Sequence, residues 1–138
     1  MKTTLGKIAG AAAIINENKE ILLLQRSFAS KRAPGKWTFP AGGIEPEDES
    51  VEHCVIREVK EETNLDFHVT GKFNFYDFIS NNKRYYSLVH LGTYSGELKI
   101  DNESEDAKFF SYNETQNLEI AFAYKTVLDD LYNAGLIV

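Results

Sequence analysis

Three glutamates crowd the end of one predicted helix in the segment 43–65 of this chain. Glu58, Glu61 and Glu62 are spaced i, i+3 and i+4, so they fall in one arc of a helix. Like charges at these spacings repel by about 0.2–0.5 kcal/mol per pair, and the helix dipole disfavours anions near its C-terminal end. Such a cluster needs a compensating partner nearby, and carboxylate oxygens are the ligands that Mg²⁺ prefers.

The composition indicates what kind of protein carries this glutamate cluster. With 138 residues, 43% of them apolar, the chain is expected to form one domain, 1–138, with its own core. The net charge of −6 argues against binding to nucleic acid or to an anionic membrane. Cys54 is the only cysteine, and we find no signal peptide or membrane-length apolar run. We therefore expect a cytoplasmic protein without a disulfide.

Apolar patterning predicts both strands and helices along the chain. Strands are expected at 7–15 and 21–25 as a hairpin, and a short strand is expected at 37–39. A long hairpin is predicted from 67–80 and 85–94, with an acidic loop at 101–106 and a late strand at 108–112. The final helix is expected to start near Asn117 and end at Gly135, with Phe122 and Tyr124 as packing residues.

The glutamates belong to a helix predicted to begin near 48–50 and to end at Asn64. Val51, Val55 and Val59 form its buried stripe, so the early turns are expected in the core and the later turns in a cleft. Asparagine suits the left-handed position that follows many helices.

Charges of opposite sign are segregated on the two sides of Ile44. No acidic residue occurs from 21 to 44, where Arg26 and Lys36 are basic, whereas acids dominate from 45 to 66. Gly42 and Gly43 stand at the boundary and permit a close approach to the main chain. The segregation indicates either two solvated surfaces or a divided site, with cations for phosphate oxygens opposite carboxylates for a metal.

The same segment resembles the signature of the Nudix hydrolases. That signature is a glycine, five residues, a glutamate, seven residues, then Arg-Glu-apolar-x-Glu-Glu-x-Gly-apolar. Asn64 replaces the last family glycine, and the upstream Pro34-Gly35-x-Trp37-x-x-Pro40 is also similar to the family's approach to the signature. The matching positions are Gly43, Glu49, Arg57, Glu58, Val59, Glu61, Glu62 and Leu65.

The resemblance implies a fold and an activity. The implied fold is α+β, a Nudix-type α/β/α sandwich with a mixed sheet between the signature helix and a C-terminal helix. The implied activity is hydrolysis of a phosphoanhydride bond in a nucleoside diphosphate-linked compound or a nucleoside triphosphate, with Mg²⁺, or alternatively Mn²⁺, as cofactor.

The resemblance also implies roles for individual residues. Glu61, Glu62 and the main-chain carbonyl of Gly42 would bind metal, and Glu58 would bind metal or act as the general base. Arg57 and Glu49 would orient the glutamates. Arg26, Lys36 and Gly43 would contact substrate. A further carboxylate from the acidic loop 101–106 is expected at the metal, and we favour Glu105 over Glu103.

Two other functions are compatible with this fold. Isopentenyl diphosphate isomerases share it but use a cysteine outside the signature helix, whereas Cys54 lies on that helix. Non-catalytic Nudix modules usually lose signature glutamates, and this chain keeps them. The absence of any proline after Pro46 argues against the ADP-ribose group. The substrate and the oligomeric state, with a homodimer as one option, stay open.

Overall fold

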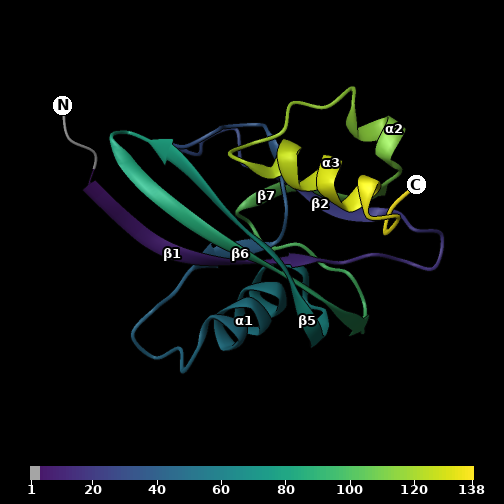
Figure 1. Cartoon of the computed structure of the whole chain (residues 1–138), viewed down its shortest axis with the longest axis horizontal. Helices are drawn as coiled ribbons and strands as arrows, with labels where there is room; N and C mark the ends of the chain where they lie inside the picture. The colour runs from purple at the N-terminus through teal and green to yellow at the C-terminus, as the bar shows by residue number, and fades with distance from the viewer. Residues whose placement is uncertain (1–3) are drawn as a thin grey trace.

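The computed structural model describes residues 4–138, which form two β-sheets with helices on either side (Figure 1). The first sheet has the strand order β4-β1-β6-β5, and its strands are β1 (Thr4–Ala13), β4 (Ala41–Gly43), β5 (Asp66–Ser80) and β6 (Lys83–Ser95). The second has the order β3-β2-β7, with β2 (Ile21–Arg26), β3 (Trp37–Thr38) and β7 (Ser104–Phe110). The helices are α1 (Val51–Thr63), α2 (Tyr112–Thr115) and α3 (Tyr124–Asn133).

The first sheet is mixed, as expected. β1 runs parallel to β6, with Ala11 opposite Val89, while β4 and β5 pair antiparallel to their neighbours. The predicted long hairpin is β5 and β6, and its turn falls at Asn81 and Asn82, both in the left-handed region at φ 50° and 61°. Asparagine tolerates this conformation better than other non-glycine residues, which fixes the turn at this point.

The expected hairpin between the first two strands is wrong. The chain does turn at 16–20, where Ile15 and Ile21 form an isolated antiparallel bridge, but β1 and β2 then separate into different sheets. The alternation of apolar residues and the turn residues predicted the turn at 16–20 correctly, but they did not show which strands pair with β1 and β2. β1 pairs instead with β6, about 70–80 positions away in sequence.

Helix α1 has the boundaries that its sequence predicts. The Ser50 side chain accepts a hydrogen bond from the His53 N–H, which satisfies one of the free donors of the first turn. At the other end Asn64 adopts the left-handed conformation, with φ 66°, and its N–H donates to the Lys60 carbonyl. Leu65 then returns to the core, where it is buried.

The helices cover opposite faces of the sheets, in the expected sandwich (Figure 1). One core cluster holds Val55 and Val59 of α1 with Leu22 and Phe67. Gly10 lets α1 approach closely, because a Cβ at this position would overlap with Val55. The other cluster packs α3 against both sheets and includes Leu23, Phe39, Val89, Val127, Leu128 and Leu131.

The C-terminal third differs from expectation in its boundaries. β7 begins at Ser104, so it takes in part of the predicted acidic loop. The last helix begins at Tyr124, and Asn117 lies in the preceding loop after the short α2, which Ser111 and Glu114 cap reciprocally. Within residues 4–138, no helix is long and apolar enough to span a membrane.

Candidate active site

The signature glutamates lie on the last turns of α1, beside the corner that β4 forms. Glu62 is nearly buried, and its carboxylate accepts a hydrogen bond of 2.9 Å from the Ala41 N–H. Glu58 points toward Gly42 and is held by Arg57, whose Nη1 lies 3.0 Å from Oε1. Glu61 is more exposed, and Arg57 reaches it at 3.3 Å. The three carboxylates therefore belong to one helix turn, with Glu58 and Glu62 facing inward.

The ionised forms of Glu58 and Glu62 are disfavoured. Burial raises the pKa of Glu58, although Arg57 opposes this shift. Burial, and then the charge of Glu58, raises the pKa of Glu62 well above its ordinary value. Desolvation and a neighbouring like charge are the conditions under which a carboxylate gains most from a nearby cation.

The surroundings of these carboxylates fit a hard metal ion. A Cβ at position 42 would overlap with the carboxyl carbon of Glu58, so only glycine lets this carboxylate lie against the main chain of β4. The donors are carboxylate and carbonyl oxygens, which suit Mg²⁺. Within the part of the chain that the structure describes, no three acidic, histidine or cysteine groups already enclose a metal-sized space.

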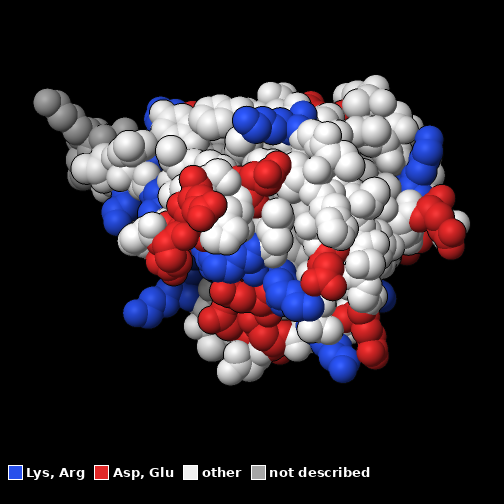
Figure 2. All heavy atoms as spheres, turned by 90° about the horizontal axis from the view of Figure 1, so that it is seen from below, with Lys and Arg blue, Asp and Glu red and all other residues white. Residues whose placement is uncertain are grey.

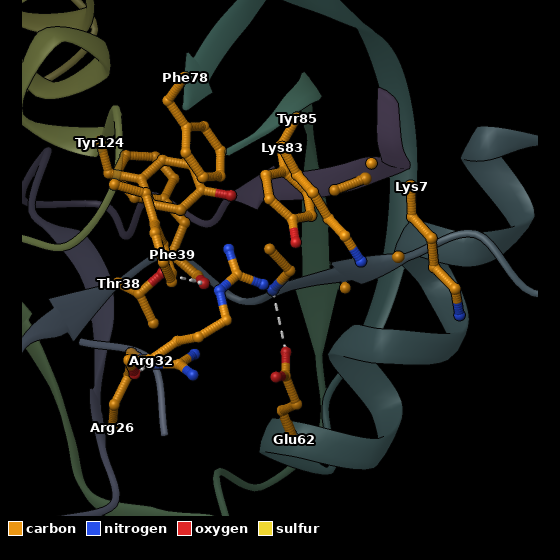
Figure 3. Close-up of a pocket in the computed structure, with 16 residues that line it drawn as sticks. Lys7, Arg26, Arg32, Thr38, Phe39, Glu62, Phe78, Lys83, Tyr85 and Tyr124 are labelled. Atoms are coloured by element: carbon orange, nitrogen blue, oxygen red, sulfur yellow. Dashed lines mark hydrogen bonds between the residues drawn. The ribbon is translucent and has the colours of Figure 1, made fainter. Parts of the chain in front are cut away.

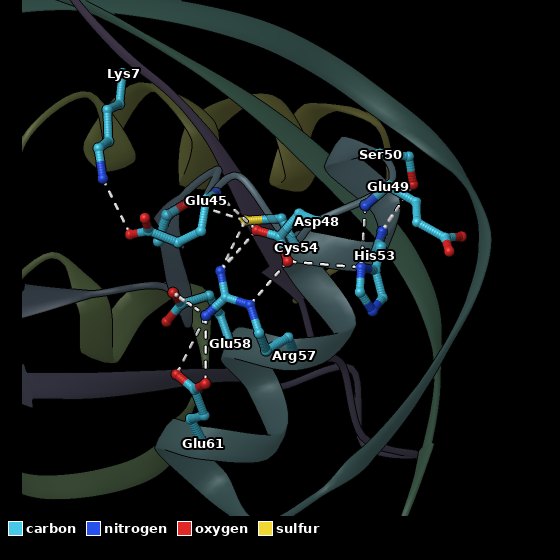
Figure 4. Close-up of polar contacts among 11 residues, drawn as sticks. Lys7, Glu45, Asp48, Glu49, Ser50, His53, Cys54, Arg57, Glu58 and Glu61 are labelled. Atoms are coloured by element: carbon cyan, nitrogen blue, oxygen red, sulfur yellow. Dashed lines mark hydrogen bonds and ion pairs between the residues drawn. The ribbon is translucent and has the colours of Figure 1, made fainter.

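Arg57 is held by Asp48 and not by Glu49 (Figure 4). Its Nε and Nη2 each lie 2.8 Å from an oxygen of Asp48, whose side chain is fully covered. The guanidinium holds the pKa of this carboxyl well below its usual range. Glu49 is exposed, and its side chain is directed away from Arg57. The side chain that contacts Arg57 here is therefore Asp48, the neighbour of the expected Glu49.

Cys54 faces the same corner as a neutral thiol. Its Sγ lies 3.5 Å from the Gly42 carbonyl oxygen, to which it donates. Burial raises its pKa to about 11, so the reactive thiolate is disfavoured near neutral pH. This environment agrees with the expectation that Cys54 does not act as an isomerase cysteine.

A cavity of about 350 Å³ opens beside Glu62 (Figure 3). Gly42 and Gly43 line it, as does Arg26, whose Nε donates to the Arg32 carbonyl at 2.8 Å. Burial, and then the charge of the neighbouring Arg32, lowers the pKa of Arg26. Lys36, also expected at the substrate, does not line this cavity.

The far side of the cavity is aromatic. Phe78 stacks on Tyr85 and on Phe122, with ring centroids 5.3 and 5.1 Å apart. The Arg32 guanidinium lies over two of these rings, 4.4 Å from the centroid of Tyr85 and 4.7 Å from that of Phe122. Phe122 and Tyr124 both pack against the core and both line the cavity, although Tyr124 is itself largely buried.

The acidic loop approaches the glutamates through Glu103. A second cavity of about 400 Å³ is lined by Arg26, Glu62 and Glu103. Glu105 does not line it, and its Oε2 accepts a hydrogen bond of 3.1 Å from the Phe28 N–H. The geometry thus favours Glu103 over Glu105 as the additional carboxylate near Glu62.

Acidic and basic side chains lie side by side on the face of the molecule seen in Figure 2. On α1, Arg57 forms ion pairs with Asp48, Glu58 and Glu61. By contrast, neither Arg26 nor Arg32 forms an ion pair among residues 4–138. These two arginines are left without carboxylate partners, whereas Lys7, which also lines the cavity, pairs with Glu45 at 3.0 Å.

The model of the NUDIX domain matches residues 5–131. The chain belongs to the Nudix family. Its relatives include the ADP-ribose pyrophosphatase of Methanocaldococcus jannaschii, which is 34% identical over 122 residues, or 85% of this chain and 68% of that protein. The CTP pyrophosphohydrolase of Escherichia coli is 35% identical over 82 residues, covering 58% of this chain and 55% of that protein.

Solved Nudix structures have the same fold. The MutT protein of Methanosarcina mazei superposes with a TM-score of 0.83 at 28% identity, over 96% of each chain. The expected Nudix α+β fold and the expected enzyme class, a pyrophosphohydrolase, are confirmed. Some relatives are much longer, and this chain spans 28% of a putative Nudix hydrolase of Caenorhabditis elegans.

Sequence reasoning missed several residues of this Nudix site. The signature spacing selects Glu49, and its neighbour Asp48 was therefore missed as a partner of Arg57. The signal that could have indicated Asp48 is its position as an acidic residue just before the start of the helix. Arg32 lies in the stretch 21–44, which has no acidic residue, but the sequence assigned it no specific role. Phe78, Tyr85 and Phe122 come from a hairpin and a loop distant in sequence, and no local pattern indicates that their rings meet.

Proposed function

We propose that this Nudix hydrolase cleaves a phosphoanhydride bond in a nucleoside diphosphate-linked compound or a nucleoside triphosphate, with Mg²⁺ bound by the glutamates of α1. One observation carries the proposal. Glu62, whose charge is disfavoured by burial, lines a cavity whose two arginines lack carboxylate partners within residues 4–138, and Glu58 lies against Gly42 at the edge of this cavity. A divalent cation would stabilise the glutamates and substrate phosphates the arginines.

Each part of the site has a role in this proposal. Glu61, Glu62 and the Gly42 carbonyl would hold the metal, which when bound lowers the pKa of water and screens phosphate oxygens. Glu58 would either join them or accept the proton of the attacking water. Arg57, fixed by Asp48, keeps the Glu58 carboxylate in place through its 3.0 Å contact. Arg26 would face the phosphates from the opposite wall.

Two of the expected residues, Glu105 at the metal and Lys36 at the substrate, lie away from the positions that these roles require. Glu105 was the expected ligand, but its bond to Phe28 and the position of Glu103 beside Glu62 favour Glu103. Lys36 lies outside the cavity and is a weaker candidate for substrate contact than Arg26. These residue roles, Mn²⁺ as an alternative ion, a cytoplasmic location and the oligomeric state all stay predictions.

The experiment compares Glu58→Gln and Glu62→Gln with Glu52→Gln, an exposed glutamate on the same helix. Phosphate release is measured over nucleotides, nucleotide sugars and dinucleotides, with Mg²⁺ and with Mn²⁺. The first two variants should lose more than about 100-fold in kcat, because each removes a charge on which the metal and the transition state depend. Circular dichroism should show that all three fold. Near-normal turnover of Glu58→Gln or Glu62→Gln at saturating Mg²⁺ contradicts the assignment.

The relatives named above act on different substrates, so they do not choose one. The archaeal protein is named for ADP-ribose and the bacterial protein for CTP. The missing downstream proline argued against the ADP-ribose group, while the similarity to the archaeal protein argues for keeping it in the panel. We therefore include both compounds.

A further inference from the structure

Arg32 occupies an unusual environment in the cavity beside Glu62. Its guanidinium lies between the rings of Tyr85 and Phe122, at 4.4 and 4.7 Å from their centroids. The Nε atom is buried and has no hydrogen-bond partner among residues 4–138. A buried donor without an acceptor is rare in folded proteins and costs stability, so it needs an explanation.

One of the rings around Arg32, that of Phe122, is carried by a residue with a strained backbone. Phe122 has φ 56°, in the left-handed region that bulky side chains seldom adopt. The conformation directs its ring toward Phe78 and toward the guanidinium, at the cavity wall. Strained residues of this kind are concentrated at ligand sites, where the surrounding structure maintains the strain.

The two ends of the cavity differ in chemistry. Glu62 and the glycine corner lie at one end, where the metal and the phosphates are proposed to bind (Figure 3). The aromatic rings lie at the other end, with Arg32 between them and Glu62 in this view. An aromatic surface suits the flat face of a nucleobase, and a guanidinium presents parallel N–H donors to acceptors on its edge.

We propose that Arg32 selects the base of the substrate, by donating hydrogen bonds to a base edge that carries two adjacent acceptors. Guanine offers O6 with N7, and cytosine offers O2 with N3. Adenine places an amino donor beside each comparable ring nitrogen, so one arm of the guanidinium would face an N–H group. A site built to donate two hydrogen bonds discriminates strongly against such a base.

This proposal rests on the proposed function and makes it narrower. It predicts that cytosine or guanine nucleotides are better substrates than ATP or ADP-ribose. Arg26 does not compete for this role, because its Nε and Nη2 are already bound to the Arg32 carbonyl and the Ser30 hydroxyl at 2.8 and 2.9 Å.

The test measures kcat/KM for CTP, GTP, ATP and ADP-ribose in the wild-type chain and in Arg32→Lys. Lysine keeps the positive charge near the rings but loses the pair of parallel donors. The wild type should prefer CTP or GTP over ATP by about 10- to 100-fold. Arg32→Lys should reduce this preference to less than about threefold, mainly by lowering the rate with the preferred nucleotide. Comparing CTP with GTP shows which acceptor pair is read.

A binding measurement separates this proposal from the hydrolytic one. Calorimetry with CMP, GMP and AMP, without added metal, should show the same base preference in the wild type and its loss in Arg32→Lys. Lys125→Ala, which removes an exposed cation of α3 that lines neither cavity, should keep the preference. Circular dichroism confirms that each variant folds.

The outcomes distinguish the two proposals. Hydrolysis without base preference in the wild type, or an equal loss for all bases in Arg32→Lys, overturns the role of Arg32 and leaves the hydrolase proposal intact. Selective binding of CMP or GMP that depends on Arg32, without hydrolysis of any nucleotide, supports base selection and overturns the hydrolase proposal.

Discussion

Asp48 and Arg57 form a two-point contact, in which Nε and Nη2 of the guanidinium each lie 2.8 Å from a carboxylate oxygen. The Glu45 N–H also donates to Asp48, at 2.8 Å, so the loop before α1 is tied to the helix at this point. Because Arg57 also contacts Glu58 and Glu61, Asp48 determines indirectly where the site glutamates lie.

Replacing Asp48 with asparagine should reduce kcat by about 10- to 100-fold, since Arg57 then loses its charged partner and no longer fixes Glu58. Steady-state kinetics with the best substrate of the panel measures this effect. Glu49→Gln is the matched control and should remain within about twofold of the wild type, because the Glu49 side chain is exposed and makes no contact with Arg57. The opposite order of effects would return the orienting role to Glu49.

Replacing Gly42 with alanine should reduce kcat by about 100-fold, because the added methyl group would occupy the space of the Glu58 carboxylate. Kinetics and Mg²⁺ titration by calorimetry test this, and both should show a displaced carboxylate. The control is Gly71→Ala in β5, where an added Cβ would have no neighbour within 4 Å. An active Gly42→Ala enzyme with normal Mg²⁺ affinity would show that Glu58 need not lie against β4.

The stability of the protein should depend on pH through His90. This residue is buried, its Nδ1 lies 3.1 Å from the Leu88 carbonyl oxygen, and its Nε2 has no partner. Burial lowers its pKa, although hydrogen bonding to the main chain of Leu88 and Ala11 and the charge of Glu52 oppose this shift, and the charge of Lys72 adds to it. The unfolded state therefore binds a proton at this histidine more readily, so the contribution of His90 to the free energy of unfolding should be greatest above pH 7. It should decrease as the pH falls through about 6.5, the ordinary pKa of histidine.

Urea denaturation between pH 5 and 8 measures this dependence. One proton accounts for at most about 1.4 kcal/mol per pH unit. His90→Gln should have a shallower slope over this range than the wild type. Val89→Ala, which removes a buried but non-titrating neighbour, should lower stability at every pH and keep the slope. An unchanged slope in His90→Gln would assign the pH dependence to other groups.

Replacing Asn64 with glycine, the family residue, should change the free energy of unfolding by less than about 1 kcal/mol. Glycine adopts the left-handed conformation freely, which offsets the loss of the 3.0 Å bond from Asn64 Nδ2 to the Glu97 carbonyl. Asn64→Val should cost about 1–3 kcal/mol, because a β-branched side chain is strained at φ 66°. Thermal and urea unfolding test both values, and equal stability of the two variants would exclude the left-handed cap as the reason for Asn64.

Local signals predicted the elements whose ends have a chemical marker. Helix α1 begins after Ser50 and ends at Asn64, as the capping preferences of serine and asparagine predict. Asn81 and Asn82 likewise turn the long hairpin. The sequence predicts that the last helix begins near Asn117, because asparagine is a favourable N-cap residue. In the structure this helix begins later, at Tyr124, after a loop in which Phe122 adopts a left-handed conformation.

The amino-acid sequence by itself determined the glutamate cluster, its helix and the family, since spacing along one helix fixes which side chains share a face. Only the tertiary structure decided that β1 pairs with β6, that Asp48 holds Arg57, and that Arg32 meets the rings of Tyr85 and Phe122. The physical reason is sequence separation for the strand pairing and the contacts of Arg32, whereas Asp48, nine positions before Arg57, is placed by the fold of the loop that precedes α1. Contacts between distant segments depend on how the two sheets and α1 pack together, and no local periodicity encodes that packing.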